Sequence, residues 1–362
     1  MMTPKERWLA TLRLRPVDRL PFWPKFDAAY PRAQVAPFRE MGNDGLHAWV
    51  GSDRHDWVGT GVKEVRQRTT VESTRAGGIT RTVYRTPHGE LEGVLRFDDG
   101  SQSWHPVAFP VRTIDDVQAM TAIYDDVTVE VDADALRQVA AEVERIGQGA
   151  VTAVGIGTSA LMQWVQHLAG VEMAQYLLLD HPAQVEALFA AMHRVLRRRA
   201  ELMAESSPAD LLYLVENTST TLVSPAQYRQ YWFPHIHDCA GITWRAGRML
   251  ALHMCGHLKA LLPELARVPA RAFEAFTSPT VGNTTLLDGR TACPDKCLIG
   301  GTNAALWLEP AEAIITQIDR DLAALPHHRG LVITSAGVMP PRCAPRTVKA
   351  VSDWVRAFPA RQ

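Results

Sequence analysis

The stretch MLALHMCG, residues 249–256, carries the pattern on which the fold of this chain depends. It begins as a short apolar run, typical of a parallel strand that is buried on both faces, and it ends on His253, Cys255 and a glycine. Helical segments, such as those after Pro182 and Pro310, separate this run from others of the same kind. The other runs are residues 151–156, 211–215, 272–276, 297–300 and 331–335.

Six buried runs that alternate with helices predict a (β/α)8 barrel, an α/β fold in which eight parallel strands form a closed sheet. Residues 20–23 are a candidate for one of the missing strands. The sequence has no G-x-G-x-x-G after a strand and no G-x-x-x-x-G-K-[ST], which disfavours the doubly wound nucleotide-binding folds. We expect one barrel domain over residues 1–362, in which residues 1–125 carry N-terminal helices, the first strands and a β-hairpin insertion around Gly89.

Composition and charge disfavour several classes of partner. A formal net charge of −1 supplies no basic field for nucleic acid or for an anionic membrane surface. No apolar stretch approaches about 18 residues, and the N-terminus is charged from Lys5 onward, so neither a spanning helix nor a signal peptide is expected. Five cysteines, an odd number, argue against a disulfide framework. We expect a soluble, cytoplasmic protein, and the sequence leaves open whether it is a monomer or a homodimer.

The polar residues that follow the predicted strands are the candidates for chemistry, because a barrel carries its active site at the carboxyl ends of its strands. His253 and Cys255 are two apart on an extended segment, so their side chains point the same way. Zinc takes nitrogen and sulfur ligands of this kind at about 2.0–2.3 Å. The alternative is a buried core cysteine beside a hydrogen-bonded histidine. The other polar residues at predicted strand ends are Glu216, Asn217, Glu274 and Asn303.

A zinc site needs more than two ligands, and the sequence offers three further donors. Cys343, after the last predicted strand, is the best remaining thiol. Glu216 is the best carboxylate, and Glu274 is a third candidate. Near the first strand, Trp23 and Phe26 could line an apolar substrate pocket, although a place in the barrel core explains them equally well.

Several short motifs occur in a characteristic order along most of the chain. In order, these are PKERWLATL, VDRLP, LVSP, LHMCG with its H-x-C-G pattern, and GGTN. Together these motifs resemble the uroporphyrinogen decarboxylase superfamily, and within it the corrinoid-linked methyltransferases. The segments are residues 4–12, 17–21, 222–225, 252–256 and 300–303.

The resemblance implies a (β/α)8 barrel with a zinc site, made by His-x-Cys and a later cysteine, beside a corrinoid that a partner protein carries. His253 and Cys255 match the first two ligands of that site. The family has S-P-G-C after the last strand, whereas this chain has Val338 at the aligned position and Cys343 five residues further on. The third ligand is therefore expected to be Cys343 or one of the two carboxylates named above.

We therefore expect a zinc-dependent methyltransferase that moves a methyl group between a small substrate, a methyl ether or a thiol, and a corrinoid such as methylcobalamin on a separate protein. A metal-free, decarboxylase-like lyase is disfavoured, because residues 22–30 lack the arginines with which such enzymes hold an acidic tetrapyrrole. A non-catalytic, metal-stabilised barrel that docks on a corrinoid protein is the other alternative. The catalytic candidates are Glu216, Asn217 and Asn303, and the substrate-binding candidates are Trp23, Phe26 and Glu274.

Overall fold

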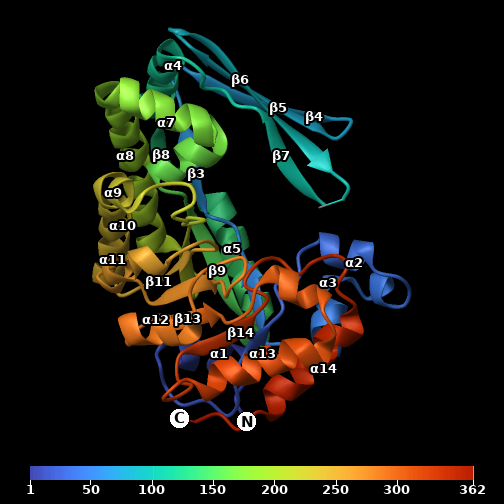
Figure 1. The fold of residues 1–362 in the computed structure, drawn as a ribbon. Helices are drawn as coiled ribbons and strands as arrows, with labels where there is room; N and C mark the ends of the chain where they lie inside the picture. Colours follow the sequence, from blue (N-terminus) through green and yellow to red (C-terminus); the bar gives the residue numbers. More distant parts are fainter. Residues whose placement is uncertain (101, 362) are drawn as a thin grey trace.

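The computed structural model describes residues 1–100 and 102–361, and its centre is a sheet of eight parallel strands rolled into a nearly closed barrel (Figure 1). The predicted (β/α)8 fold is therefore confirmed. All six buried runs of the sequence are strands of this barrel, and the N-terminal candidate contains a seventh. In sheet order the strands are β1 (Phe22–Trp23), β14 (Leu331–Thr334), β13 (Cys297–Gly300), β12 (Ala272–Phe276), β11 (Met249–His253), β10 (Leu211–Val215), β9 (Ala150–Gly157) and β2 (Arg54–Trp57).

The barrel is closed between β1 and β2 by hydrogen bonds around Asp53. The backbone N–H of Asp53 donates to the carbonyl of Phe22 at 2.8 Å, and the Asp53 carboxylate accepts from the backbone N–H of Phe22 at 3.1 Å. Arg7 and Arg19 form ion pairs with the same fully buried carboxylate. Burying a charge is costly unless it is paired, so these two arginines allow Asp53 to join the strands.

Helix α1 (Pro4–Leu12) covers the amino-terminal end of the barrel. Its Trp8 is fully buried and packs with the residues that begin the strands, among them Val151, Leu211 and Ala272. The indole N–H of Trp8 donates to the carbonyl of Asp53 at 3.0 Å. Because Trp8 fills this opening, a ligand can reach the interior of the barrel from the carboxyl ends of the strands.

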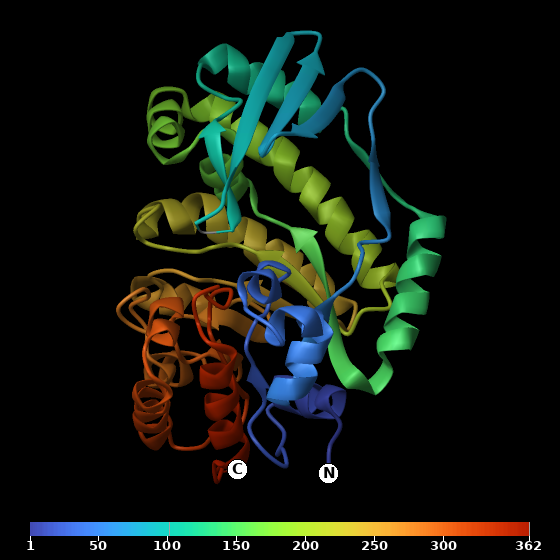
Figure 2. The ribbon, with the colours of Figure 1, turned by 90° about the vertical axis from the view of Figure 1, so that its right-hand side faces the viewer.

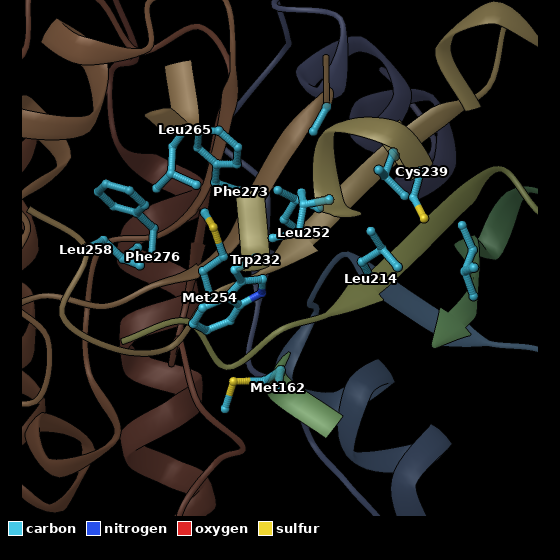
Figure 3. Packing of buried hydrophobic residues seen from close by; sticks show 14 of the residues in the cluster. Met162, Leu214, Trp232, Cys239, Leu252, Met254, Leu258, Leu265, Phe273 and Phe276 are labelled. Atoms are coloured by element: carbon cyan, nitrogen blue, oxygen red, sulfur yellow. The ribbon is translucent and has the colours of Figure 1, made fainter. Parts of the chain in front are cut away.

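The outer faces of the strands pack against the surrounding helices in one large core. Leu214, Leu252 and Phe273 come from three neighbouring strands and lie in one cluster with Cys239 of α10 (Figure 3). Burial raises the pKa of the Cys239 thiol, so this cysteine is a packing residue. The helices are α2 (Ala29–Ala33), α3 (Phe38–Val50), α4 (Ile114–Asp125), α5 (Ala133–Ile146), α6 (Ala160–Gln163), α7 (Val171–Asp180), α8 (Pro182–Ser206), α9 (Pro225–Gln227), α10 (Phe233–Arg245), α11 (Leu262–Ala266), α12 (Leu286–Ala292), α13 (Ala311–Ala323) and α14 (Pro345–Ala357).

The segment between β2 and β9 is an insertion that is larger than the expected hairpin. The predicted hairpin around Gly89 is present as β5 (Ile79–Thr86) and β6 (Gly89–Asp98). These strands are the middle of a four-stranded antiparallel sheet, completed by β4 (Thr70–Ala76) and β7 (Ser103–Ala108), which stands apart from the barrel (Figures 1 and 2). A separate antiparallel pair joins β3 (Val62–Val65) to β8 (Thr128–Val131).

Helix α4 links this insertion to the barrel, because it packs on both the insertion sheet and α8. Thr113 and Asp116 form a capping box that starts α4, and Pro182 starts the 25-residue helix α8. Within the described ranges, every helix is too short or too polar to cross a lipid bilayer.

Candidate active site

A chain of interacting polar side chains runs across the carboxyl ends of four strands. Lys25, just after β1, lies 2.6 Å from Glu274 of β12, measured from Nζ to Oε1. The other carboxylate oxygen of Glu274 accepts a hydrogen bond from Nδ1 of His253, at the end of β11. Cys255 is close enough to the imidazole to help raise the pKa of His253, and its thiol donates to Oδ1 of Asn217, after β10, at 3.2 Å. We call these five residues the mouth network.

Parallel strand register explains why the middle of the mouth network assembles. His253 and Glu274 are paired residues of the β11–β12 ladder, so their side chains leave the sheet next to one another. His253 and Cys255 are both partly exposed, whereas Met254 between them is fully buried. Exposure thus alternates along residues 253–255 with the two-residue period expected from the H-x-C spacing.

Gly256 lets the segment after Cys255 pack closely on the loop after β10. A Cβ at Gly256 would lie 2.3 Å from Cβ of Ser219 and 2.5 Å from the carbonyl oxygen of Thr218. Such distances are shorter than real Cβ contacts, so any larger residue would push the two loops apart. Asn217 lies in the same loop, and its distance from Cys255 therefore depends on this glycine.

The electrostatics of the mouth network favour an ion pair. Burial raises the pKa of Glu274, but Lys25 and His253 lower it by more, so the carboxylate stays ionised although the residue is only 1% exposed. Burial lowers the pKa of His253, but Glu274 and Cys255 raise it by more. Lys25 is held in place by a second hydrogen bond of 3.1 Å to the carbonyl of Ala336, in the loop after β14.

Comparison with known proteins places this barrel in a family. The family model for uroporphyrinogen decarboxylase matches residues 95–358. The chain belongs to the uroporphyrinogen decarboxylase family. None of the curated protein sequences matches it significantly.

One solved structure resembles this family member in fold over nearly the whole chain, and a second matches part of it. A methyltransferase from Methanosarcina mazei is 14% identical and matches over 98% of each chain with a TM-score of 0.61. A Listeria monocytogenes protein assigned as a vitamin-B12-independent methionine synthase is also 14% identical, over 59% of this chain and 63% of the other, with a TM-score of 0.38. At such identity the first likeness shows the shared barrel fold, and the second is too distant to support an argument.

Cys343, the expected third zinc ligand, makes no hydrogen bond with the mouth network among the described residues. Its side chain is buried, its thiol contacts the carbonyl of Ala344 at 3.8 Å, and its own carbonyl accepts a hydrogen bond of 2.8 Å from the hydroxyl of Tyr30. Burial raises the pKa of this thiol to about 12. In the part of the chain that the structure describes, no group of three or more His, Cys, Asp or Glu side chains is arranged to hold a metal ion.

Glu216 was expected as a catalytic residue or ligand, but both of its oxygens are already occupied. One accepts from the backbone N–H of Ser159 at 2.9 Å, and the other accepts from the Ser159 hydroxyl and the Trp232 indole. The side chain is fully buried, and burial raises its pKa. These contacts support a structural role, in which Glu216 joins the loop after β9 to the helical turn that precedes α10.

Asn303, the third catalytic candidate, is used in a similar way. Its Oδ1 caps a short 3-10 turn by accepting from the N–H of Leu306 at 3.0 Å. Its Nδ2 donates to the Ser278 hydroxyl at 3.1 Å and to the carbonyl of Pro279 at 2.9 Å. These contacts leave the buried amide without a free polar atom directed at a ligand.

The proposed substrate contacts also need correction. Trp23 lies inside the barrel, where its ring stacks on His55 with centroids 4.3 Å apart, and Phe26 stacks on Tyr30 at 4.5 Å. Both aromatic residues are therefore core residues. Glu274 is in the mouth network, but both of its carboxylate oxygens bind protein groups, Lys25 and His253. Its role is therefore to orient His253, and it has no free oxygen for a substrate.

Lys25 is the member of the mouth network that the sequence did not suggest. It lies in an aromatic segment after a strand of two residues, so neither a strand pattern nor a charge cluster marks it. The available signal was its position, since a lone lysine after the first barrel strand lies at the end where active sites form.

Proposed function

We propose that this family member transfers a methyl group between a small substrate, a methyl ether or a thiol, and a corrinoid that a partner protein carries, with zinc at His253 and Cys255. The mouth network is the observation that carries the proposal. It brings a nitrogen donor and a sulfur donor together at the accessible end of the barrel, within a family fold shared with the Methanosarcina mazei methyltransferase.

The donors fit zinc in part. Histidines that bind metals usually donate their second ring N–H to a carboxylate, which fixes the ring and leaves the other nitrogen for the metal. Glu274 accepts from Nδ1 of His253, so Nε2 is the remaining ring nitrogen. Cys255 supplies the thiol. A third protein ligand is not in place among the described residues, and the remaining positions would fall to water or substrate.

Each residue of the mouth network has a role in this proposal. Lys25 keeps Glu274 ionised, Glu274 holds the imidazole of His253, and Asn217 fixes the position of the Cys255 sulfur. A bound zinc would supply Lewis acidity, which lowers the pKa of a substrate thiol or polarises an ether oxygen. The competing functions are the metal-free lyase and the non-catalytic docking barrel.

The test combines metal analysis with an activity assay. Wild-type protein purified without chelators should hold about one zinc per chain, and Cys255→Ala should lose it. The wild type should also demethylate free methylcobalamin with 2-mercaptoethanol as acceptor, or take up a methyl group from an aryl methyl ether onto reduced cobalamin. Zinc without either activity would favour the docking barrel. An activity toward an acidic tetrapyrrole that survives chelation would favour the lyase.

A further inference from the structure

A cavity of about 420 Å³ opens at the amino-terminal end of the barrel, on the opposite end from the mouth network. Arg13 and Arg15, which follow α1, line it together with Arg248 and Arg271, which immediately precede β11 and β12. Trp244, near the end of α10, completes the wall. No carboxylate is among the residues that line this cavity, which we call the arginine cavity.

The positive charge of the arginine cavity is not neutralised locally. Across residues 1–100 and 102–361, no carboxylate lies within 4.0 Å of the guanidinium nitrogens of these four arginines. Asp210 is the carboxylate that acts on Arg248, and it lies 2.9 Å from Lys5 in an ion pair. Since the whole chain has a net charge of −1, four unpaired arginines around one cavity do not reflect a generally basic composition.

Two of the arginines are held in place by neutral groups. Arg248 donates to the main-chain carbonyls of Ser207, Ala204 and Ala209 at 2.9, 3.2 and 2.5 Å, which leaves two of its five N–H donors for a ligand. The guanidinium of Arg271 lies over the Trp244 ring, 5.5 Å from its centroid, and its Nε has no hydrogen-bond partner among the described atoms. Fixed guanidinium groups without carboxylate partners are suited to bind phosphate, whose oxygens match their fork of N–H donors.

Trp244 adds an aromatic surface to this charge. Trp244 is 54% exposed, whereas half of the ten tryptophans are buried. An exposed indole beside arginines offers a face on which a flat ring can stack. The volume is within the range of cavities that hold small molecules.

We propose that the arginine cavity binds a phosphorylated small molecule that carries a flat ring, with the chemistry of a nucleoside diphosphate. The arginines bind the phosphate groups and Trp244 stacks on the ring. This site is independent of the mouth network and of the methyl-transfer proposal, because the two lie at opposite ends of the barrel.

The test measures the binding of ADP and of pyrophosphate by calorimetry at low salt. ADP should bind the wild type more tightly than pyrophosphate. The double variant Arg13→Gln/Arg15→Gln should weaken both about tenfold or more, since each lost charge-assisted hydrogen bond is worth that order of affinity. Trp244→Ala should weaken ADP while leaving pyrophosphate unchanged. Arg245→Gln, on the same helix but outside the cavity, is the matched control.

Absence of ADP binding to the wild type at millimolar concentration would overturn the proposal, as would equal binding by the double arginine variant. Equal affinities for ADP and pyrophosphate would overturn the claim that the ligand carries a flat ring. Thermal unfolding of each variant shows whether it is folded. If the double variant is not folded, two other measurements replace it. These are ADP binding by the single variant Arg15→Gln and the weakening of wild-type ADP binding by added salt.

Discussion

His253 and Glu274 face each other in register on neighbouring strands, and the carboxylate accepts the Nδ1 hydrogen of the imidazole. Lys25 lies on the far side of the same carboxylate, 2.6 Å away. Three charges are thus held together at the mouth of the barrel, with the carboxylate buried and the two cations partly exposed, and each depends on the others.

Replacing Glu274 by Gln should weaken both the fold and the metal site. The substitution leaves Lys25 buried without an anion, which costs about 3–5 kcal/mol of unfolding free energy. It also removes the acceptor that orients His253, and zinc affinity should fall about 10- to 100-fold. Urea unfolding and competition with a chelator measure the two effects. Glu312→Gln, at an exposed position of α13, is the control. Wild-type values for Glu274→Gln would show that the network does not orient the histidine.

Cys343→Ser should leave the zinc content unchanged, because this thiol is buried and is not grouped with His253 and Cys255 as a metal site among the described residues. Val338→Cys should instead raise zinc affinity. Val338 is 50% exposed and lies two residues beyond Ala336, whose carbonyl binds Lys25, so a thiol there is next to the mouth network. Metal analysis under reducing conditions measures both variants. Loss of zinc in Cys343→Ser would mean that the loop after β14 rearranges to bring this thiol to the metal.

Trp232→Phe should lower stability without affecting the metal. The change removes the indole donor to Glu216 and leaves a fully buried carboxylate oxygen with one partner fewer, at a cost of about 1–3 kcal/mol. Chemical unfolding measures the cost, and zinc content should equal that of the wild type. If zinc is lost while the fold is kept, Glu216 acts on the metal site and its assignment as a structural residue is wrong.

Acid should weaken the contact between α1 and the segment before β1. Hydrogen bonding to Arg7 is the main cause that lowers the pKa of Asp18 from 3.8 to about 2. A carboxylate whose pKa is lower in the folded than in the unfolded protein stabilises the fold at pH values above its unfolded pKa. This stabilisation is lost as the pH falls through the pKa of the folded state. Asp18→Asn should therefore reduce the unfolding free energy at about pH 6, and the difference from wild type should shrink between about pH 4 and pH 2. A difference that does not change with pH would contradict the ion pair.

Local patterns were enough to predict the barrel and the centre of its candidate site. Continuous apolar runs indicated the strands, and the two-residue alternation of an extended segment predicted that His253 and Cys255 point to one side. Each of these two features depends only on residues that are near one another in the chain. The second barrel strand was missed, since its sequence RHDW is polar. His55 in that strand is nevertheless buried, with its Nε2 3.1 Å from the hydroxyl of Tyr213.

Only the tertiary structure decided which polar groups remain available for chemistry. Glu216 and Asn303 are at strand ends, as the sequence suggested, but Ser159 and Ser278 from other segments occupy their polar atoms. Lys25 joins the mouth network through Glu274, a residue 249 positions away. A hydrogen bond is satisfied by whichever donor or acceptor folding brings within reach, and the spacing of residues along one chain carries no record of that partner.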